Sequence, residues 1–192
     1  MTASSDHDPT VLPDGLPVPE DDGACDHLPG LKGPAIALPS TQGGTVDLST
    51  RANLRTIVYC YPRTGVPGED LPEGWDAIPG ARGCTPQSCA FRDHAAEMAA
   101  LGAEVFGLST QTPDYQAEMA ARLHLPFGVL SDSDLAFTRA LSLPTFTVQG
   151  MELIRRLTLV LQSGRISHVF YPVFPPDESA EQVLDWLRRN PA

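Results

Sequence analysis

Two cysteines stand five positions apart, as Cys84 and Cys89, where the sequence predicts the start of a helix. Thr85 followed by Pro86 is typical of a helix cap and a first helical residue. A helix N-terminus carries a partial positive charge and unpaired N–H groups, which favour a thiolate over a thiol. We therefore expect Cys84 to be the more nucleophilic cysteine, and the pair to have a redox function.

The spacing of the two cysteines limits how they could react with each other. In an intact helix, five residues separate two Cα atoms by roughly 8 to 9 Å and place them on different faces. A disulfide requires Cα atoms within about 7 Å. If Cys84 and Cys89 are chemical partners, the first turn or two of the helix must unwind after Cys84 has reacted. The spacing thus predicts a conformational switch.

The residues around the cysteines resemble those of the peroxiredoxins, specifically the bacterioferritin-comigratory or peroxiredoxin Q group. The resemblance extends from about Leu31 to about Trp186. It depends on a Tyr-Pro strand end, a Gly-Cys-Thr helix start, Cys-x4-Cys and a following Phe-Arg-Asp, which stand here as Tyr61-Pro62, Gly83-Cys84-Thr85, Cys84 to Cys89, and Phe91-Arg92-Asp93.

This resemblance implies a function. Cys84 matches the peroxidatic cysteine, which attacks the O–O bond of hydrogen peroxide or a small alkyl hydroperoxide and becomes a sulfenic acid. Cys89 matches the resolving cysteine of an atypical two-cysteine enzyme, and thioredoxin or another dithiol would reduce the intrachain disulfide. No cofactor or metal is implied. Two alternatives remain: a peroxide-sensing thiol switch with little turnover, and a general disulfide oxidoreductase, which the absence of Cys-x2-Cys disfavours.

One family feature is missing at its usual spacing. The family carries a hydroxyl residue three positions before its peroxidatic cysteine, but this chain has Ala81 there. The proline that matches the family's, Pro62, is instead followed by an insertion at about residues 65–82. We propose Thr64 as the hydroxyl that hydrogen-bonds the peroxide. The insertion either shapes peroxide access or is a decoration anchored by Trp75, and the sequence favours neither.

A second family feature is an arginine at the start of a late strand, found here as Arg156 in Arg156-Leu157-Thr158-Leu159. A guanidinium near the sulfur would favour the thiolate and stabilise charge on the departing oxygen. Because side chains alternate along a strand, only one of Arg155 and Arg156 should face the cysteine, and the spacing from Thr158 favours Arg156. Arg92 is either a second cation near the thiolate or an ion-pair partner of Asp93 or Glu97.

The other thiols and the histidines suggest no competing site. Cys60 lies in an apolar strand pattern and is expected to be buried. Cys25 lies among acidic residues, which disfavour its thiolate. A metal site built from the ligand types of Cys84, Cys89, His94 and His27 is disfavoured, because Cys-x4-Cys is a poor chelate spacing.

Composition limits the partners and the compartment. The net charge of −11 argues against nucleic acid or an anionic membrane as a partner. No apolar run is long enough to span a bilayer, and the first residues lack the pattern of a secretory signal, so we expect a cytoplasmic protein. An intrachain resolving cysteine removes the need for a second subunit, and a monomer is expected.

The chain of 192 residues suits one domain at 29–192 after an N-terminal arm at 1–28 that is flexible or draped. Alternating strands and helices with a terminal hairpin predict an α/β fold, a mixed sheet with helices on both faces. The resemblance implies that this fold is thioredoxin-like. We expect strands at 35–38, 45–48, 56–61, 103–109 and 127–130, a hairpin turning at Ser163-Gly164, and helices at 84–101, 113–124, 132–141 and 178–189.

Overall fold

The computed structural model describes residues 11–51 and 55–191. Its centre is a mixed sheet in which β3 and β4 pair in parallel, as do β4 and β5, while β8 is antiparallel to both β3 and β9. The strands lie in the order β5 (Val129–Ser131), β4 (Ala103–Ser109), β3 (Arg55–Cys60), β8 (Leu157–Gln162) and β9 (Arg165–Phe170). The turn between β8 and β9 falls at Ser163-Gly164, as predicted.

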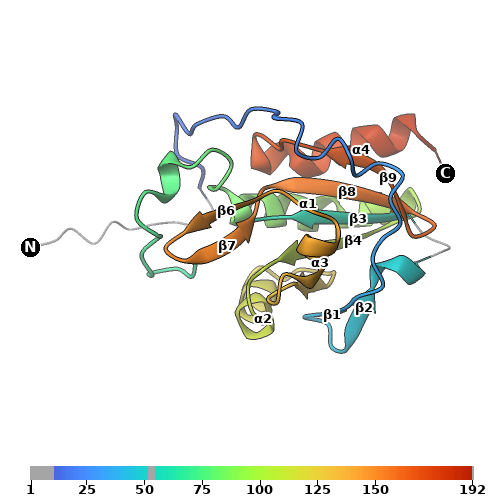
Figure 1. Ribbon diagram of the computed structural model, residues 1–192, viewed down its shortest axis with the longest axis horizontal. Coiled ribbons are helices and arrows are strands. Elements are labelled where there is room, and N and C mark those ends of the chain that lie inside the picture. The colour runs from blue at the N-terminus through green and yellow to red at the C-terminus, as the bar shows by residue number, and fades with distance from the viewer. Residues whose placement is uncertain (1–10, 52–54, 192) are drawn as a thin grey trace, which may run out of the picture.

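Helices cover both faces of this sheet, as Figure 1 shows and as the sequence predicts. Tyr59 of β3 lies in a core shared with the helices α1, α2 and α4. Its neighbour Cys60 points to the opposite core, which contains Phe137 of α3. The helices are α1 (Cys84–Ala100), α2 (Pro113–Arg122), α3 (Ala136–Ala140) and α4 (Ser179–Arg189), with short 3-10 turns at Leu48–Thr50, Trp75–Ala77 and Pro176–Glu178. The fold is the expected thioredoxin-like α/β arrangement.

Two hairpins lie outside the central sheet. The expected first hairpin consists of β1 (Ala37–Pro39) and β2 (Thr45–Asp47). A second hairpin, of β6 (Thr145–Val148) and β7 (Met151–Ile154), was not among the predicted elements. Its two-residue turn, Gln149-Gly150, has positive φ at both positions, which suits the right-handed twist of the paired strands.

The insertion at 65–82 packs on the second hairpin (Figure 1). Trp75 is buried, with 3% of its surface exposed, and its ring centroid lies 6.1 Å from that of Phe146 in β6. The glycines and prolines of this segment disfavour regular structure, yet Trp75–Ala77 forms a 3-10 turn. Burial of an aromatic side chain stabilises a turn that local propensity alone would not predict.

Helix α1 begins one residue earlier than the predicted cap. Gly83 is the N-cap, with φ 98°, and Cys84 is the first helical residue, so the assignment of Thr85 and Pro86 as cap and first residue was wrong. A proline is tolerated anywhere in the first turn, because the N–H groups there have no intrahelical partner. The first five residues of α1 are all buried, so the helix is not amphipathic along its first turn.

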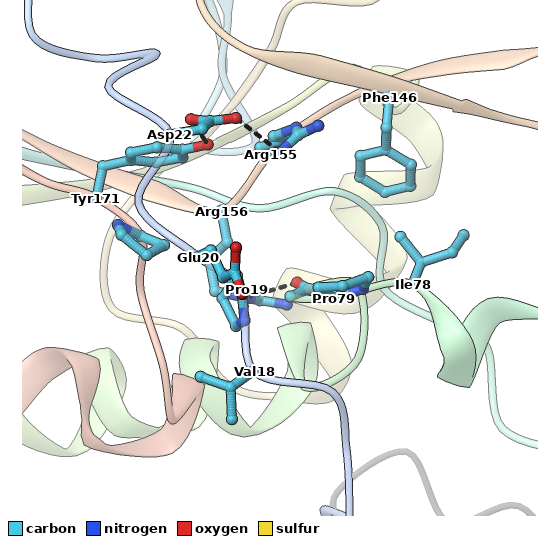
Figure 2. A pocket seen from close by; sticks show the side chains of 12 residues that line it. Val18, Pro19, Glu20, Asp22, Ile78, Pro79, Phe146, Arg155, Arg156 and Tyr171 are labelled. Carbon is cyan, nitrogen blue, oxygen red and sulfur yellow. Dashed lines mark hydrogen bonds and ion pairs between the residues drawn. The ribbon is translucent and has the colours of Figure 1, made fainter.

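The described part of the N-terminal arm, from residue 11, is packed on the domain. Asp22 accepts a hydrogen bond from Tyr171 and pairs with Arg155, and Figure 2 shows these three side chains together. This part of the arm and residues 78–80 together line a cavity of about 390 Å³. Further along, Cys25 and Leu28 enter the sheet's core. Residues 1–10 of the predicted arm lie outside the described residues.

In the described ranges, 11–51 and 55–191, no helix has both the length and the apolar character that a membrane span requires.

Candidate active site

Cys84 is buried at the start of α1, with 3% of its surface exposed. Arg156, the residue immediately before β8, donates a hydrogen bond from Nη2 to the Cys84 Sγ at 3.1 Å. The thiol form can in turn donate to the carbonyl oxygen of Ala81 at 3.5 Å. The structure therefore brings together the cysteine and the arginine that the sequence singled out.

The guanidinium of Arg156 is held on all sides. It donates to the carbonyl oxygens of Gly80, Ala81 and Arg82 at 3.0 to 3.2 Å, and to the side-chain oxygen of Gln87. Of these partners and Cys84, only the sulfur can carry a negative charge. The guanidinium is therefore placed to donate hydrogen bonds to negative charge that develops at the sulfur during a reaction.

Arg155 points elsewhere. Its guanidinium forms an exposed ion pair with Asp22 at 3.4 Å, and in Figure 2 it is directed toward Asp22 while Arg156 runs toward the segment that carries Pro79. The alternation of side chains along an extended segment accounts for the difference.

Thr64 lies in the same small cavity as Cys84 and is 1% exposed. Its hydroxyl donates to Gln111 Oε1 at 3.2 Å, and its carbonyl oxygen accepts from Gln111 and Tyr115. With its proton engaged by Gln111, the Thr64 hydroxyl oxygen is left free to accept a further hydrogen bond. The cavity has a volume of about 20 Å³ and is lined by Arg63, Thr64, Gly65, Leu71, Trp75, Arg82, Gly83, Cys84 and Thr85.

Cys89 lies one and a half turns further along the same helix and is half-buried. Burial raises the pKa of its thiol, and Arg92 opposes that shift while Asp93 adds to it. Arg92 itself pairs with Asp93 at 2.8 Å, so it is an ion-pair partner and a neighbour of Cys89. Both cysteines are free thiols and α1 is continuous between them.

Sequence reasoning missed two glutamines of the site. Gln87 is fully buried and connects Arg156 to the hydroxyl of Ser179, the first residue of α4. The side-chain oxygen of Gln111 accepts from the backbone N–H and the hydroxyl of Thr64, and its side-chain nitrogen donates to the Thr64 carbonyl oxygen. The position of Gln87 between the two cysteines was a usable signal, whereas nothing in the sequence marks Gln111.

The remaining cysteines are buried away from this site. Cys60 is fully buried, as predicted. Burial raises the pKa of Cys25 to about 12, and Asp22, Asp21 and Asp26 add to the shift.

No cluster of three metal-ligating side chains occurs among residues 11–51 and 55–191. The two histidines considered above as metal ligands have other partners: His27 contacts the carbonyl oxygen of Leu141, and His94 pairs with Glu97.

A thioredoxin-like sheet that presents a buried cysteine to an arginine at a helix start defines a thiol-based redox protein. The redoxin family model matches residues 28–184. The chain is 29% identical to peroxiredoxin Bcp of Escherichia coli over 82% of this chain and 93% of the relative. It is 32% identical to a Mycobacterium tuberculosis peroxiredoxin over 76% of this chain and 85% of the relative.

Among solved structures, peroxidoxin BcpB from Mycobacterium tuberculosis superposes with a TM-score of 0.68 at 24% identity, covering 86% of this chain and all of that one. The chain therefore belongs to the redoxin family, as a peroxiredoxin of the Bcp and peroxiredoxin Q group, and is a thiol peroxidase.

Proposed function

We propose that this enzyme reduces hydrogen peroxide and small alkyl hydroperoxides at Cys84, resolves the product with Cys89 and is recycled by thioredoxin or a similar dithiol. The observation that carries the proposal is the 3.1 Å contact between Arg156 Nη2 and Cys84 Sγ, at a sulfur that also lines a cavity of about 20 Å³. A cavity of that size accommodates a group little larger than water, such as the –OOH group of a hydroperoxide.

In the first step, the Cys84 thiolate attacks the terminal oxygen of the peroxide. A sulfur–oxygen bond forms as the O–O bond breaks, and the sulfur is oxidised to a sulfenic acid. The departing hydroxide or alkoxide takes up a proton and leaves as water or alcohol. Arg156 donates hydrogen bonds where charge develops, and Thr64 accepts one from the attacked O–H.

In the second step, the Cys89 sulfur attacks the sulfenic sulfur. A disulfide forms and the sulfenic oxygen leaves as water. Because Cys84 and Cys89 are too far apart in the intact helix, the first turn of α1 must open. This opening breaks the hydrogen bond from the Gln87 N–H to the Gly83 carbonyl, which measures 3.0 Å, and withdraws the Gln87 side chain from Arg156 and Ser179.

In the third step, a dithiol attacks the Cys84–Cys89 disulfide by exchange. The dithiol leaves as its own disulfide and both cysteines return to thiols. We propose that the cycle runs within a single chain, since both reacting sulfurs belong to one helix. We also propose that the enzyme acts in the cytoplasm.

The test is peroxide consumption with an excess of thioredoxin and its reductase. We expect many turnovers for the wild type, none for Cys84→Ser, and a single oxidation for Cys89→Ser, in which Cys84 stalls as a sulfenic acid and over-oxidises more readily. Cys60→Ser serves as a matched control, since Cys60 lies in the opposite core. One-shot oxidation by the wild type would favour the peroxide-sensing switch instead. Full steady-state activity of Cys89→Ser would contradict the resolving role.

A further inference from the structure

Arg63 occupies a position that the reaction described above does not use. It directly follows Pro62 beyond the end of β3, and its half-buried side chain lines the cavity at Cys84. The same side chain also lines a second cavity of about 470 Å³. That cavity has a mixed lining: hydroxyl and amide side chains on one side, and apolar side chains on the other, those of Leu135, Met151 and Leu153. Arg63 thus lines both the cavity at the reacting sulfur and a larger cavity of mixed polarity.

The partners of the Arg63 guanidinium are weak and uncharged. It donates to the thioether sulfur of Met151 at 3.6 Å and to the hydroxyl oxygen of Tyr115 at 3.4 Å, and it lies 5.0 Å from the centre of the Tyr115 ring. Its Nε is buried without a hydrogen-bond partner. Within residues 11–51 and 55–191, no ion pair joins Arg63 to a carboxylate.

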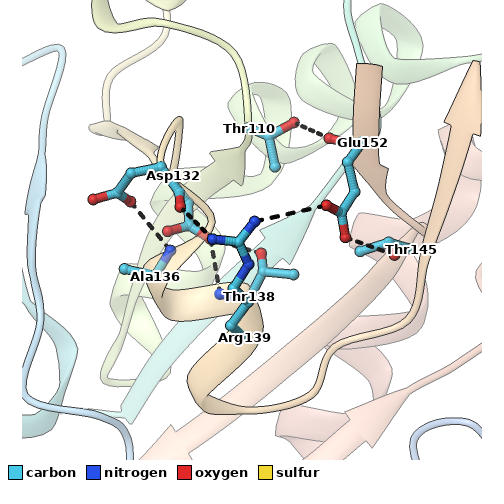
Figure 3. Close-up of polar contacts among 8 residues, drawn as sticks. Thr110, Asp132, Ala136, Thr138, Arg139, Thr145 and Glu152 are labelled. Carbon is cyan, nitrogen blue, oxygen red and sulfur yellow. Dashed lines mark hydrogen bonds and ion pairs between the residues drawn. The ribbon is translucent and has the colours of Figure 1, made fainter. Parts of the chain in front are cut away.

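Of the acidic side chains around Arg63 and Tyr115, Glu152 and Glu118 are already engaged, and Glu69 is exposed to solvent. Glu152 lines the larger cavity, but its carboxylate accepts from the Thr145 hydroxyl at 3.2 Å and lies 3.9 Å from Arg139. Figure 3 shows Glu152 between these two partners. On the α2 side, Glu118 pairs with Arg122 at 2.7 Å. Among the described residues, the charge of Arg63 is therefore not paired with any carboxylate, although the chain as a whole carries a net charge of −11.

A partly buried guanidinium without a counterion is a site for an anionic group, because its planar array of N–H donors matches a carboxylate. We propose that Arg63 binds the carboxylate of a short organic hydroperoxide, whose body occupies the larger cavity while its peroxide group enters the cavity at Cys84. This inference rests on the proposed function and adds a substrate class to it.

The experiment compares three peroxides on the full chain with dithiothreitol as reductant. They are hydrogen peroxide, a short tertiary alkyl hydroperoxide that carries a carboxylate, and the methyl amide of that hydroperoxide. We expect the wild type to prefer the carboxylate over the amide by about tenfold in kcat/KM, as for one charge-assisted hydrogen-bonded pair. Arg63→Gln should bring this ratio close to one.

Arg188→Gln is the matched control, since it removes one positive charge from the exposed face of α4 and should preserve the preference. Arg63→Lys keeps the charge but loses the planar array of N–H donors, so it should retain part of the preference for the carboxylate over the amide. Equal rates for the carboxylate and the amide in the wild type would overturn the inference. A uniform loss for all three peroxides in Arg63→Gln would also overturn it, because it would place the action of Arg63 on the sulfur or on the fold.

A binding measurement separates this inference from the proposed function. The alcohol that corresponds to the carboxylate hydroperoxide keeps the carboxylate and lacks the peroxide, and its binding can be titrated calorimetrically. We expect binding to the reduced wild type that Arg63→Gln weakens by about tenfold. If the wild type reduced no peroxide but still bound this alcohol through Arg63, the proposed function would fail and the binding site would stand. If the alcohol did not bind to the wild type, the proposed binding site at Arg63 would be wrong.

Discussion

Arg156 and Cys84 stand 72 positions apart in sequence, yet the guanidinium of Arg156 joins the sulfur of Cys84 to the three carbonyl groups that precede it, at residues 80–82. The end of the insertion is therefore fixed by the same side chain that contacts the reacting atom. Displacing residues 80–82 would also displace Arg156. This arrangement connects the insertion, the helix start and β8 into one site.

The rate of reaction with peroxide should depend strongly on Arg156. Arg156→Gln removes the charge and most of the N–H donors at the sulfur, and we expect the second-order rate of Cys84 oxidation to fall by about 10² to 10³. Stopped-flow mixing with hydrogen peroxide measures this rate. Arg155→Gln is the neighbouring control and should stay within about twofold. Comparable losses for the two variants would contradict the assignment.

The substitution Thr64→Val tests the displaced hydroxyl. It keeps the shape of the side chain and removes the oxygen, so we expect the rate with hydrogen peroxide to fall by about tenfold, as for one lost hydrogen bond. Thr64→Ser keeps the oxygen and should retain most of the rate. If the valine variant reacted like the wild type, the family's hydroxyl would have no replacement at this position.

Gly83 should tolerate no side chain. Its φ is 98°, and a Cβ there would overlap Pro176 and lie 2.7 Å from Leu12. We expect Gly83→Ala to lower the free energy of unfolding in urea by about 2 to 4 kcal/mol, from backbone strain and overpacking together. Gly43 has φ 92° with open space around it, so Gly43→Ala reports the strain alone. Equal losses in the two variants would mean that Leu12 and Pro176 do not hold the helix start.

Stability should fall in alkaline solution because of Cys25. Burial raises its pKa in the folded protein from 9.0 to about 12, so above pH 9 the unfolded chain releases a proton that the folded chain keeps. The unfolded state then binds fewer protons, and the free energy of unfolding decreases with pH by up to about 1.4 kcal/mol per unit for this group. Urea titrations between pH 8 and about pH 11 measure the slope. Cys25→Ser should reduce the slope without abolishing it, because burial also raises the pKa of Cys60, and an unchanged slope would exclude Cys25 as a source.

The sequence was sufficient to predict the position of a residue where a local rule and the tertiary contacts agree. Alternation along an extended segment selected Arg156 over Arg155, and an apolar strand pattern placed Cys60 in the core. It was insufficient at the start of α1. There Thr85 and Pro86 satisfy the usual rule for a cap, but the left-handed backbone of Gly83, packed under Leu12 and Pro176, sets the helix start instead.

Other parts of the site depend on long-range contacts that no local sequence pattern predicts. Gln111 reaches Thr64 across 47 positions, and a lone glutamine carries no signal of such a role. The hairpin of β6 and β7 did have a signal, the turn Gln149-Gly150 between two strand-like segments. The burial of Trp75 under that hairpin was predictable from its size, whereas its partner was not.

The central claim is that Cys84 and Cys89 join when the start of α1 opens. The most direct measurement is mass mapping of the disulfides formed after one equivalent of hydrogen peroxide, with free thiols alkylated before proteolysis. The account predicts one peptide pair linked between Cys84 and Cys89, with Cys25 and Cys60 recovered as alkylated thiols. Recovery of Cys89 as a free thiol, with Cys84 linked elsewhere or unoxidised, would contradict it.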